Sequence, residues 1–439
     1  MKILQIIQNN TSTLDTTLPL LWYLKKNDPS ASITILYCAG SKNQVLRKAK
    51  FLNEFTNENG MSQLDLADLL FQSNFIKKLW RFVFEKSKDD SYSFKNIIQN
   101  PVSFFLKFRF LYIGTSLRKK TENFLVNKLI DTKKIKKYIE PDLIFFDLRE
   151  KSRFPGRDYI FQYLYDLEKP TILLPHSPHD ITPTSEITCF DESGDYFPFF
   201  AKYWIPFKHS KAYTRFPERK KDFLLFGYPA FDSEWIQFNK KSNRNKTRKT
   251  CLVMIRNFYD EGLLPPEGEY FTVSFQSNIK FLNDIQDALE KLNAKVNLII
   301  KPHPKASLPR VIDLINKSKL KNWEVSYESF YETLNKTDFV ISTFTTSLLI
   351  PQFYGIPTIV FEDYVQRYVN EWDILSKVYK GLSLYCQSGE YLHDFIQKAM
   401  ENYNSEKDIS HLRTFFADNQ LLKNKQILEL LISKPYEIH

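Results

Sequence analysis

Short apolar runs alternate with helix-forming tracts along most of this 439-residue chain, and this alternation constrains the fold more than any other feature. The runs are MKILQIIQ, SITILYCAG, PDLIFFDL, TILLPH, YWIPF, DFLLFGYP, TCLVMIRN, KVNLIIKPHP, WEVSY, TDFVIST and PTIVFED. Apolar runs of this length between helical tracts predict parallel strands joined by crossover helices. We therefore expect an α/β protein whose ligands bind beyond the carboxyl ends of its strands.

A polar segment at residues 239–249, NKKSNRNKTRK, interrupts the alternation, which then restarts. This segment is the best linker in the chain, and the length by itself suggests two or three domains. We predict two Rossmann-like domains that face a cleft, at residues 1–240 and 250–439. A long helical tract at about residues 62–138 is predicted to be an insertion in the first domain.

The predicted insertion carries most of the positive charge. Residues 77–137 hold 16 Lys/Arg against 5 Asp/Glu, which accounts for the whole net charge of +10. Aromatic and cationic residues are interleaved there in LWRFVF and SFFLKFRFLY. Such a surface suits anionic lipid head groups better than nucleic acid, because no nucleic-acid-binding module accompanies the charge. The same tract also fits a helical insertion with a core of aromatics and solvated lysines.

Cysteine spacing and apolar length exclude several classes of protein. Four separated cysteines without any CxxC spacing argue against a zinc site or a disulfide framework and favour a reducing cytoplasm. The start, MKILQIIQNNTSTLD, predicts a first strand and no signal peptide. Residues 339–361 lack charge over 23 positions, but prolines, a glycine and hydroxyl residues break the run, so we expect a buried α/β unit and no membrane span.

Polar residues cluster where the strands of the second half are predicted to end. The candidate ligand-binding residues are Arg256, Asn257, Lys301, His303, Pro304, Ser342, Thr343, Thr345, Thr346 and Ser347. A cation, an imidazole and a hydroxyl-rich turn thus converge on one predicted sheet edge.

The run STFTTSLL leads into a predicted helix, and helix starts bind anions through exposed N–H groups. Hydroxyls at Thr345, Thr346 and Ser347 can cap that helix and donate to phosphate oxygens. With Lys301 and Arg256 nearby, we predict a phosphate site. Taken singly, the same features also fit an ordinary threonine cap and a loop histidine with a structural role.

The stretch NLIIKPHPK places His303 between Pro302 and Pro304. Each proline fixes its own φ and restricts the residue before it, so the imidazole is held off the strand end with little freedom. An imidazole there can hydrogen-bond a phosphate or a leaving group.

Other phosphate and metal signatures are missing from the sequence. It contains no GxGxxG and no GxxxxGK[ST], which argues against nicotinamide dehydrogenases and P-loop NTPases. The acidic pairs Asp191/Glu192 and Asp260/Glu261 are expected to be surface loop residues, so we predict neither a metal nor a cofactor.

In the first half, TILLPHSPHD ends a predicted strand with His176 and His179, and Asp147 ends the strand LIFFD. Any of these could deprotonate a hydroxyl nucleophile if it faces the ligand. His176 is the first candidate because it lies immediately at the strand end, although a packed structural histidine would look the same.

The ordered set GYPAFD, a polar linker, KPHP and TDFVISTFTTSLLIPQFYGIPTIVF resembles the carboxy-terminal half of bacterial GT-B glycosyltransferases of surface polysaccharide synthesis. The similar groups are capsule and lipooligosaccharide sialyltransferases, Kdo transferases and CDP-glycerol glycerophosphotransferases. The resemblance covers residues 224–361 and extends to the first domain only by architecture. It implies that His303-Pro304 and Thr345-Thr346 with Ser347 contact the phosphate of a cytidine-activated donor.

The resemblance implies an inverting, metal-independent transferase that moves a sugar from a donor of the CMP-sialic acid or CMP-Kdo type to a glycan or glycolipid acceptor and releases CMP or CDP. The first domain would bind the acceptor and supply the base, and the protein would be cytoplasmic or peripheral at the inner membrane face. Alternatives are a CDP-polyol phosphotransferase, a non-hydrolysing sugar-nucleotide 2-epimerase, and a non-catalytic glycan- or lipid-binding scaffold.

Overall fold

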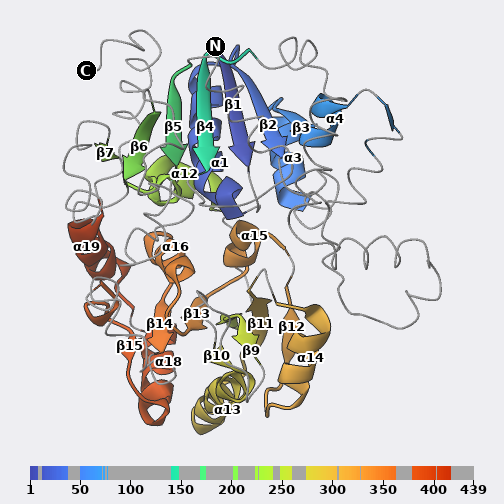
Figure 1. Cartoon of the computed structure of the whole chain (residues 1–439). Coiled ribbons are helices and arrows are strands. Elements are labelled where there is room, and N and C mark those ends of the chain that lie inside the picture. The colour runs from blue at the N-terminus through green and yellow to red at the C-terminus, as the bar shows by residue number, and fades with distance from the viewer. Residues whose placement is uncertain are drawn as a thin grey trace, which may run out of the picture. The chain divides into compact units, whose positions relative to one another are not determined.

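The computed structural model describes residues 1–7, 12–37, 50–71, 73–74, 77, 140–147, 169–174, 201–205, 223–225, 227–240, 248–259, 273–303, 306–326, 328–361, 378–401 and 403–416. The chain divides into two compact units. Of the described residues, those up to Tyr203 belong to the first unit and those from Trp204 onward to the second. In both, helices flank a β-sheet (Figure 1).

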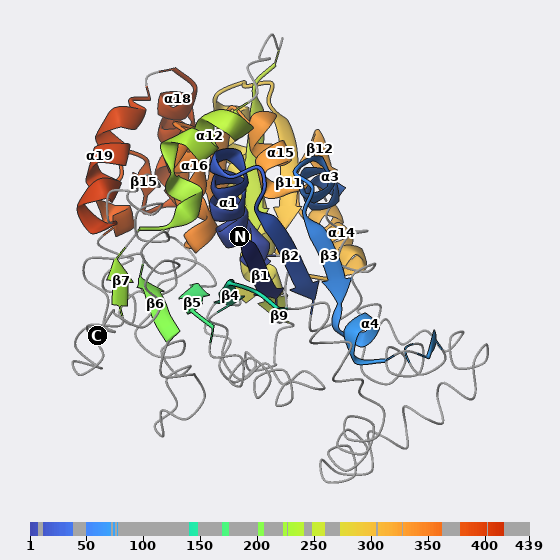
Figure 2. The same cartoon turned by 90° about the horizontal axis from the view of Figure 1, so that it is seen from above.

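The first sheet has seven strands in the order β3-β2-β1-β4-β5-β6-β7. All pairings recorded from β3 across to β6 are parallel, which confirms the predicted class. Figure 2 shows β1, β2 and β3 side by side. The strands are β1 Lys2–Ile7, β2 Ser32–Tyr37, β3 Ser62–Asp65, β4 Leu143–Asp147, β5 Thr171–Leu174, β6 Ala201–Ile205 and β7 Phe223–Leu225, and the helices of this region are α1 Ser12–Asn27, α3 Lys50–Glu58 and α4 Leu66–Leu70.

Strand β1 lies inside the sheet, between β2 and β4. Five of its six residues are buried, as expected for a parallel strand that is covered on both faces and therefore carries a continuous apolar run. The buried polar residue in this run is Gln5, whose amide nitrogen donates to the carbonyl of Ile6 at 3.1 Å.

The predicted helical tract does not begin at residue 62, because residues 62–65 form the edge strand β3 beside β2. The Tyr37 hydroxyl donates to Gln63 Oε1 at 2.9 Å, and Gln63 Nε2 donates to Thr56 Oγ1 at 2.6 Å. The bond to Tyr37 joins residues 26 positions apart, so the short run SQLD does not reveal it. Helix begins only at Leu66, and nearly all of the predicted basic tract at 77–137 lies outside the described residues.

The second sheet has six strands in the order β12-β11-β8-β13-β14-β15, and every adjacent pair is parallel. The first five in sequence match predicted runs, and β15 was not predicted. The strands are β8 Thr250–Ile255, β11 Asn297–Pro302, β12 Trp323–Val325, β13 Phe339–Ser342, β14 Thr358–Phe361 and β15 Tyr385–Cys386. A separate parallel pair is formed by β9 Phe258–Tyr259 and β10 Val273–Ser274.

Three helices of the second unit, α13 Phe275–Lys291, α14 Leu308–Asn316 and α18 Leu392–Glu401, supply the apolar core that packs on alternate residues of the strands. Phe281 and Ile285 of α13 and Val253 of strand β8 all belong to this buried core. The remaining helical elements are η4 Pro229–Phe231, α12 Ser233–Asn239, α15 Phe330–Asn335, η5 Thr346–Leu348, α16 Leu349–Phe353, η7 Gly389–Tyr391 and α19 Ser405–Phe415.

The uncharged segment 339–361 folds as β13, η5, α16 and β14, as predicted for a buried α/β unit. Helix α16 ends where Gly355 adopts φ of 70°. The Gly355 amide donates to Gln352 O and the Ile356 amide to Pro351 O, a Schellman ending that favours glycine at this position. Within the part of the chain that the structure describes, no helix combines the length and apolar character needed to cross a membrane.

The GYPAFD segment packs within the second unit, although the sequence-based boundary at 240–250 places it in the first. Asp232 caps α12 by accepting from the amides of Glu234 at 2.9 Å and Trp235 at 3.0 Å. The Phe231 ring stacks on Phe353 at 4.2 Å. Aromatic contact with a segment more than a hundred residues later thus accompanies the assignment of GYPAFD to the second unit.

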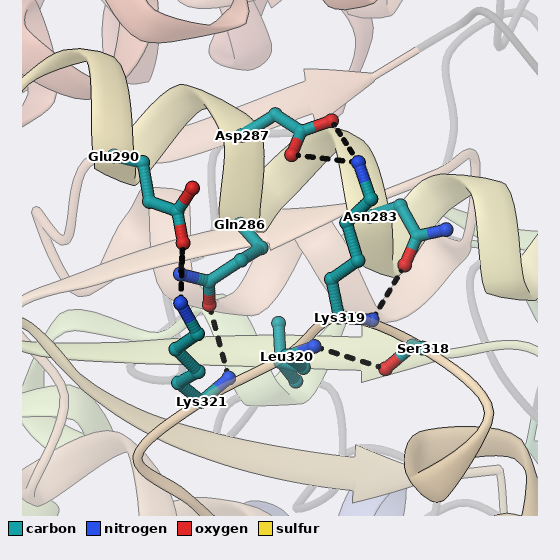
Figure 3. Close-up of polar contacts among 8 residues, drawn as sticks. All are labelled: Asn283, Gln286, Asp287, Glu290, Ser318, Lys319, Leu320 and Lys321. Carbon is teal, nitrogen blue, oxygen red and sulfur yellow. Dashed lines mark hydrogen bonds and ion pairs between the residues drawn. The ribbon is translucent and has the colours of Figure 1, made fainter.

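Side chains of α13 hold the loop that precedes the edge strand β12 (Figure 3). The backbone amides of Lys319 and Lys321 donate to the side-chain oxygens of Asn283 at 2.7 Å and Gln286 at 3.0 Å. The ammonium groups of the same lysines pair with Asp287 at 3.2 Å and Glu290 at 2.8 Å. Residues at helical spacing on α13 thus fix the main chain and the side chains of this loop together.

Candidate functional site

The predicted ligand-binding residues of the second unit follow three neighbouring strands. Strand β8 lies between β11 and β13, with Pro302 opposite Ile255 and Ser342 opposite Met254. Adjacent strands are separated by about 4.8 Å, so the ends of β11 and β13 lie about 10 Å apart across β8. The structure therefore brings the KPHP run and the hydroxyl-rich turn to one sheet edge.

The backbone of His303 is fixed at this edge by two hydrogen bonds. Its amide donates to Ile255 O at 3.0 Å, and its carbonyl accepts from the Ala306 amide at 2.8 Å. His303 is exposed. The structure thus anchors the main chain of a histidine that reaches solvent, in line with the rigidity predicted from its flanking prolines, while Pro304 lies outside the described residues.

Lys301 is the penultimate residue of β11 and is half-buried. Its ammonium group donates to the carbonyl of Glu328 at 2.6 Å. This bond links the end of β11 to the loop after the edge strand β12. The lysine therefore holds the loop backbone as well as bringing positive charge to the carboxyl edge.

The hydroxyl-rich turn divides into a buried part and an exposed part. Ser342 is fully buried and its hydroxyl donates to Met254 O at 3.0 Å, which ties the end of β13 to β8. Thr343 is also buried, Thr345 is half-buried and Ser347 is exposed. Ser342 thus holds two strands together, whereas Ser347 is exposed and can reach a ligand.

Among the side chains that the structure describes, no hydroxyl is seen to cap α16. The chain forms the 3-10 turn η5 from Thr346, and the N-cap of α16 is Leu348, which makes no side-chain capping bond. The turn is closed instead by a backbone bond from the Leu348 amide to Thr345 O at 3.0 Å. The Thr346 side chain lies outside the described part of the structure.

Arg256 follows the central strand β8 and is only 7% exposed, although a guanidinium stays charged at any physiological pH. It lies close enough to Tyr379 to act electrostatically on that phenol. Asn257, the next residue, accepts a backbone bond from the Val273 amide at 3.1 Å and so begins the β9–β10 pair. A buried cation therefore stands between the ends of β11 and β13.

Three aromatic residues at this edge were not predicted as part of the site. Tyr379 stacks on Phe344 with 5.3 Å between ring centroids, and Phe344 also stacks on Tyr385 at 6.2 Å. The Tyr379 hydroxyl donates to Thr345 O at 2.6 Å. Only Phe344 lies inside the motif read from the sequence, and nothing local marks Tyr379, because its partners precede it by more than thirty residues.

The candidate base residues of the first unit are placed only in part. Asp147 is the last residue of β4 and lies opposite Leu174, the last residue of β5, so the ends of these strands are adjacent. The side chain of Asp147 and all of His176 and His179 lie outside the described residues. Their roles stay predictions.

A search for metal-binding side chains among the described residues finds no group of three or more histidine, cysteine, aspartate or glutamate residues. The ion pairs Lys319–Asp287 and Lys321–Glu290 are exposed, and each contains a single acidic residue. At the carboxyl edge of the second sheet, the groups suited to a ligand are cations, amides and hydroxyls. This donor set suits an anion.

No protein-family model and no curated protein sequence matches the chain. Among solved structures, it is similar to a "putative UDP-N-acetylglucosamine 2-epimerase" from Listeria monocytogenes, with 10% identity, coverage of 100% of this chain and 98% of the other, and a TM-score of 0.53. At this identity the likeness shows the fold alone. It supports the GT-B-like, two-domain α/β architecture predicted from the sequence.

Two further similar structures have TM-scores below 0.5. The wall teichoic acid polymerase TagF gives 0.48 at 10% identity, with 99% of this chain and 88% of the other covered. The UDP-GlcNAc 2-epimerase of Methanocaldococcus jannaschii, in complex with UDP-GlcNAc and UDP, gives 0.47 at 11% identity, with 94% and 99% covered.

Proposed function

We propose that the chain is a glycosyltransferase that binds a nucleotide-activated sugar at the carboxyl edge of the second sheet. The observation that carries the proposal is the convergence of Arg256, His303 and the 342–347 turn on the ends of three adjacent strands. Ligands of parallel α/β sheets bind at such edges. Cations, backbone amides and hydroxyls together suit a phosphate group.

In this proposal Arg256 and Lys301 neutralise the charge of the donor phosphate, and His303 hydrogen-bonds the departing phosphate oxygen. Because Arg256 is buried, its attraction for an anion is screened less than that of an exposed lysine. Charge stabilisation of this kind acts where charge develops in the transition state, and it contributes much of the rate enhancement of group transfer.

The reaction that we propose is inverting and independent of metal. A base of the first unit, His176, Asp147 or His179, takes the proton of an acceptor hydroxyl, whose oxygen forms the new glycosidic bond while the bond from the sugar to the phosphate breaks. The choice of a CMP-linked or CDP-linked donor and of a cell-surface glycan acceptor rests on the resemblance of residues 224–361 to cytidine-dependent transferases.

Thermal unfolding of the full chain in the presence of CMP, CDP, UDP, GDP, CMP-sialic acid and UDP-N-acetylglucosamine tests the donor. A ligand of the folded state stabilises by RT ln(1 + [L]/Kd), about 2.7 kcal/mol at a hundredfold excess over Kd. We expect CMP or CDP and the CMP-sugar to raise the melting temperature most. Equal, negligible shifts with every nucleotide would contradict the proposal.

Product analysis separates the transferase from its alternatives. A glycosyltransferase releases CMP or CDP and adds a sugar without phosphorus, whereas a polyol phosphotransferase leaves new phosphorus in the acceptor. An epimerase needs no acceptor and would convert UDP-N-acetylglucosamine, the compound in the name of the similar Listeria protein, into its 2-epimer. A non-catalytic scaffold would turn over none of these compounds.

A further inference from the structure

Tyr379 contacts the turn of the proposed phosphate site, although no recognised sequence motif marks the tyrosine itself. It is fully buried, and its hydroxyl donates to Thr345 O at 2.6 Å. Its ring is stacked nearly parallel on Phe344, with an interplanar angle of 12°. One side chain therefore holds both a carbonyl and a ring of the turn that follows β13.

The turn after β13 is fixed at two further points. At its start, Ser342 Oγ donates to Met254 O on β8. At its end, the Leu348 amide donates to Thr345 O, the same carbonyl that Tyr379 contacts. Without the tyrosine hydroxyl, Thr345 O would keep, of the bonds described for it, the internal one from the Leu348 amide.

The buried cation Arg256 acts electrostatically on the same phenol. Burial raises the pKa of Tyr379 far above that of an ordinary tyrosine, and the positive charge of Arg256 acts in the opposite direction with a smaller effect. The phenol is therefore neutral in the physiological range and always able to donate its proton to Thr345 O. It contacts the turn and is within electrostatic reach of Arg256.

We propose that Tyr379 is a positioning residue that sets the 343–347 turn relative to Arg256, so that both reach one donor phosphate. This inference rests on the proposed function and names how its site is held. Binding groups lose effect when they are displaced by a fraction of an ångström, so buried partners that fix them matter for affinity. The contribution of Tyr379 comes through Thr345 and Phe344.

Tyr379→Phe removes the hydroxyl and keeps the ring that stacks on Phe344. Tyr403→Phe is the matched control, because the Tyr403 hydroxyl shares its one proton between Gln352 Oε1 at 2.7 Å and Asp408 Oδ2 at 3.2 Å in the same unit, away from the 343–347 turn. Both variants lose a phenolic hydrogen bond. A merely structural role would affect the two alike.

The experiment measures the affinity of the full chain for CMP and CDP by calorimetry, together with KM and kcat for CMP-sialic acid and hydrogen exchange of the 339–350 peptide. Tyr379→Phe should raise the nucleotide Kd and the donor KM roughly 3- to 10-fold, because one buried hydrogen bond is lost. The variant should keep kcat within about twofold of the parent. Exchange in the 339–350 peptide should become faster. Tyr403→Phe should leave Kd and KM within about twofold of the parent.

Wild-type affinity in Tyr379→Phe overturns the positioning role, and so does an equal loss in Tyr403→Phe, which would show general loosening of the unit. Binding of neither CMP nor CDP by the parent chain is a different result: it removes the cytidine-dependent function, and the role of Tyr379 in that function goes with it. A drop in kcat without a change in KM would also contradict the assignment.

Discussion

Two sets of polar contacts hold loops of the second unit, and they differ in how much water reaches them. At the carboxyl edge, Tyr379 and Ser342 are fully buried where they bond to main-chain carbonyls. On the surface of α13, Lys321 and Glu290 form an ion pair with side chains that are 69% and 52% exposed. Both sets fix a loop next to a strand of the same sheet.

This difference in burial indicates which single side chains matter most for the structure of this unit. A buried group that loses its partner stays desolvated, at a cost of about 1–3 kcal/mol. An exposed ion pair exchanges its partner for water and salt and typically contributes at most about 1 kcal/mol. We therefore expect function and stability to depend on the carboxyl edge and its buried supports, and little on the surface of α13.

The largest effect is expected on turnover. His303→Ala should lower kcat about 100-fold or more, because the proposed donor to the departing phosphate is lost. His393→Ala, on α18 in the same unit, should leave turnover within about twofold, and so should Lys319→Ala on the α13 surface. Activity assays with CMP-sialic acid check this, and unchanged turnover in His303→Ala would remove the residue from the proposed site.

The second effect concerns a buried carboxylate. Asp408 Oδ1 accepts from the Ser383 amide at 2.8 Å and from Ser383 Oγ at 2.6 Å, and Oδ2 accepts from Tyr403. Asp408→Ala removes the charged acceptor of both Ser383 bonds, while the Tyr403 hydroxyl keeps Gln352 Oε1 at 2.7 Å, so we expect a loss of about 2 kcal/mol. Hydrogen exchange of β13 and β14 amides measures it, and Asp287→Ala on the exposed surface should change exchange little. Similar losses of stability in Asp408→Ala and Asp287→Ala would contradict the expected difference between buried and exposed carboxylates.

A smaller effect on stability is expected at the end of strand β13. Ser342→Ala removes the bond to Met254 O and should cost about 1 kcal/mol in the same exchange measurement. Ser318→Ala is the control, because its hydroxyl donates to Ile315 O at 2.7 Å in a less buried setting. A loss in Ser318→Ala as large as that in Ser342→Ala would show that burial is not the deciding factor.

The smallest effect is the pH dependence of the surface network. Hydrogen bonds from Lys321 and Gln286 lower the pKa of Glu290, so its contribution is full above the pKa of an unfolded glutamate, about 4.3, and is lost as pH falls through the lowered value. A hydrogen bond to Glu290 and its charge raise the pKa of Lys321, whose contribution is full below about 10.4 and is lost as pH rises through the raised value.

Glu290→Gln tests this pH dependence. The small difference in stability between the parent and this variant should be constant near neutral pH and should shrink as pH falls below about 4. Unfolding in urea at several pH values checks the direction, and added salt should reduce the difference. A difference that grows as pH falls would contradict the sign of the pKa shift.

The sequence by itself determined the fold class and the content of one sheet edge. Apolar runs such as those of β8, β11 and β13 are local patterns, and parallel strands place their following residues at one edge whatever the rest of the chain does. That is why Arg256, His303 and Ser342 could be grouped before their positions were known. The strand content of the second sheet was predictable for the same reason, apart from β15.

Only the tertiary structure decided the features that depend on contacts between distant segments. Residues 62–65 became an edge strand because they pair with β2, and the GYPAFD segment joined the second unit because Phe231 packs on Phe353 and Phe416. Tyr379 acquired its place beside Thr345 in the same way. Burial and hydrogen bonding at these points arise from partners far away in the sequence, and a local pattern carries no record of them.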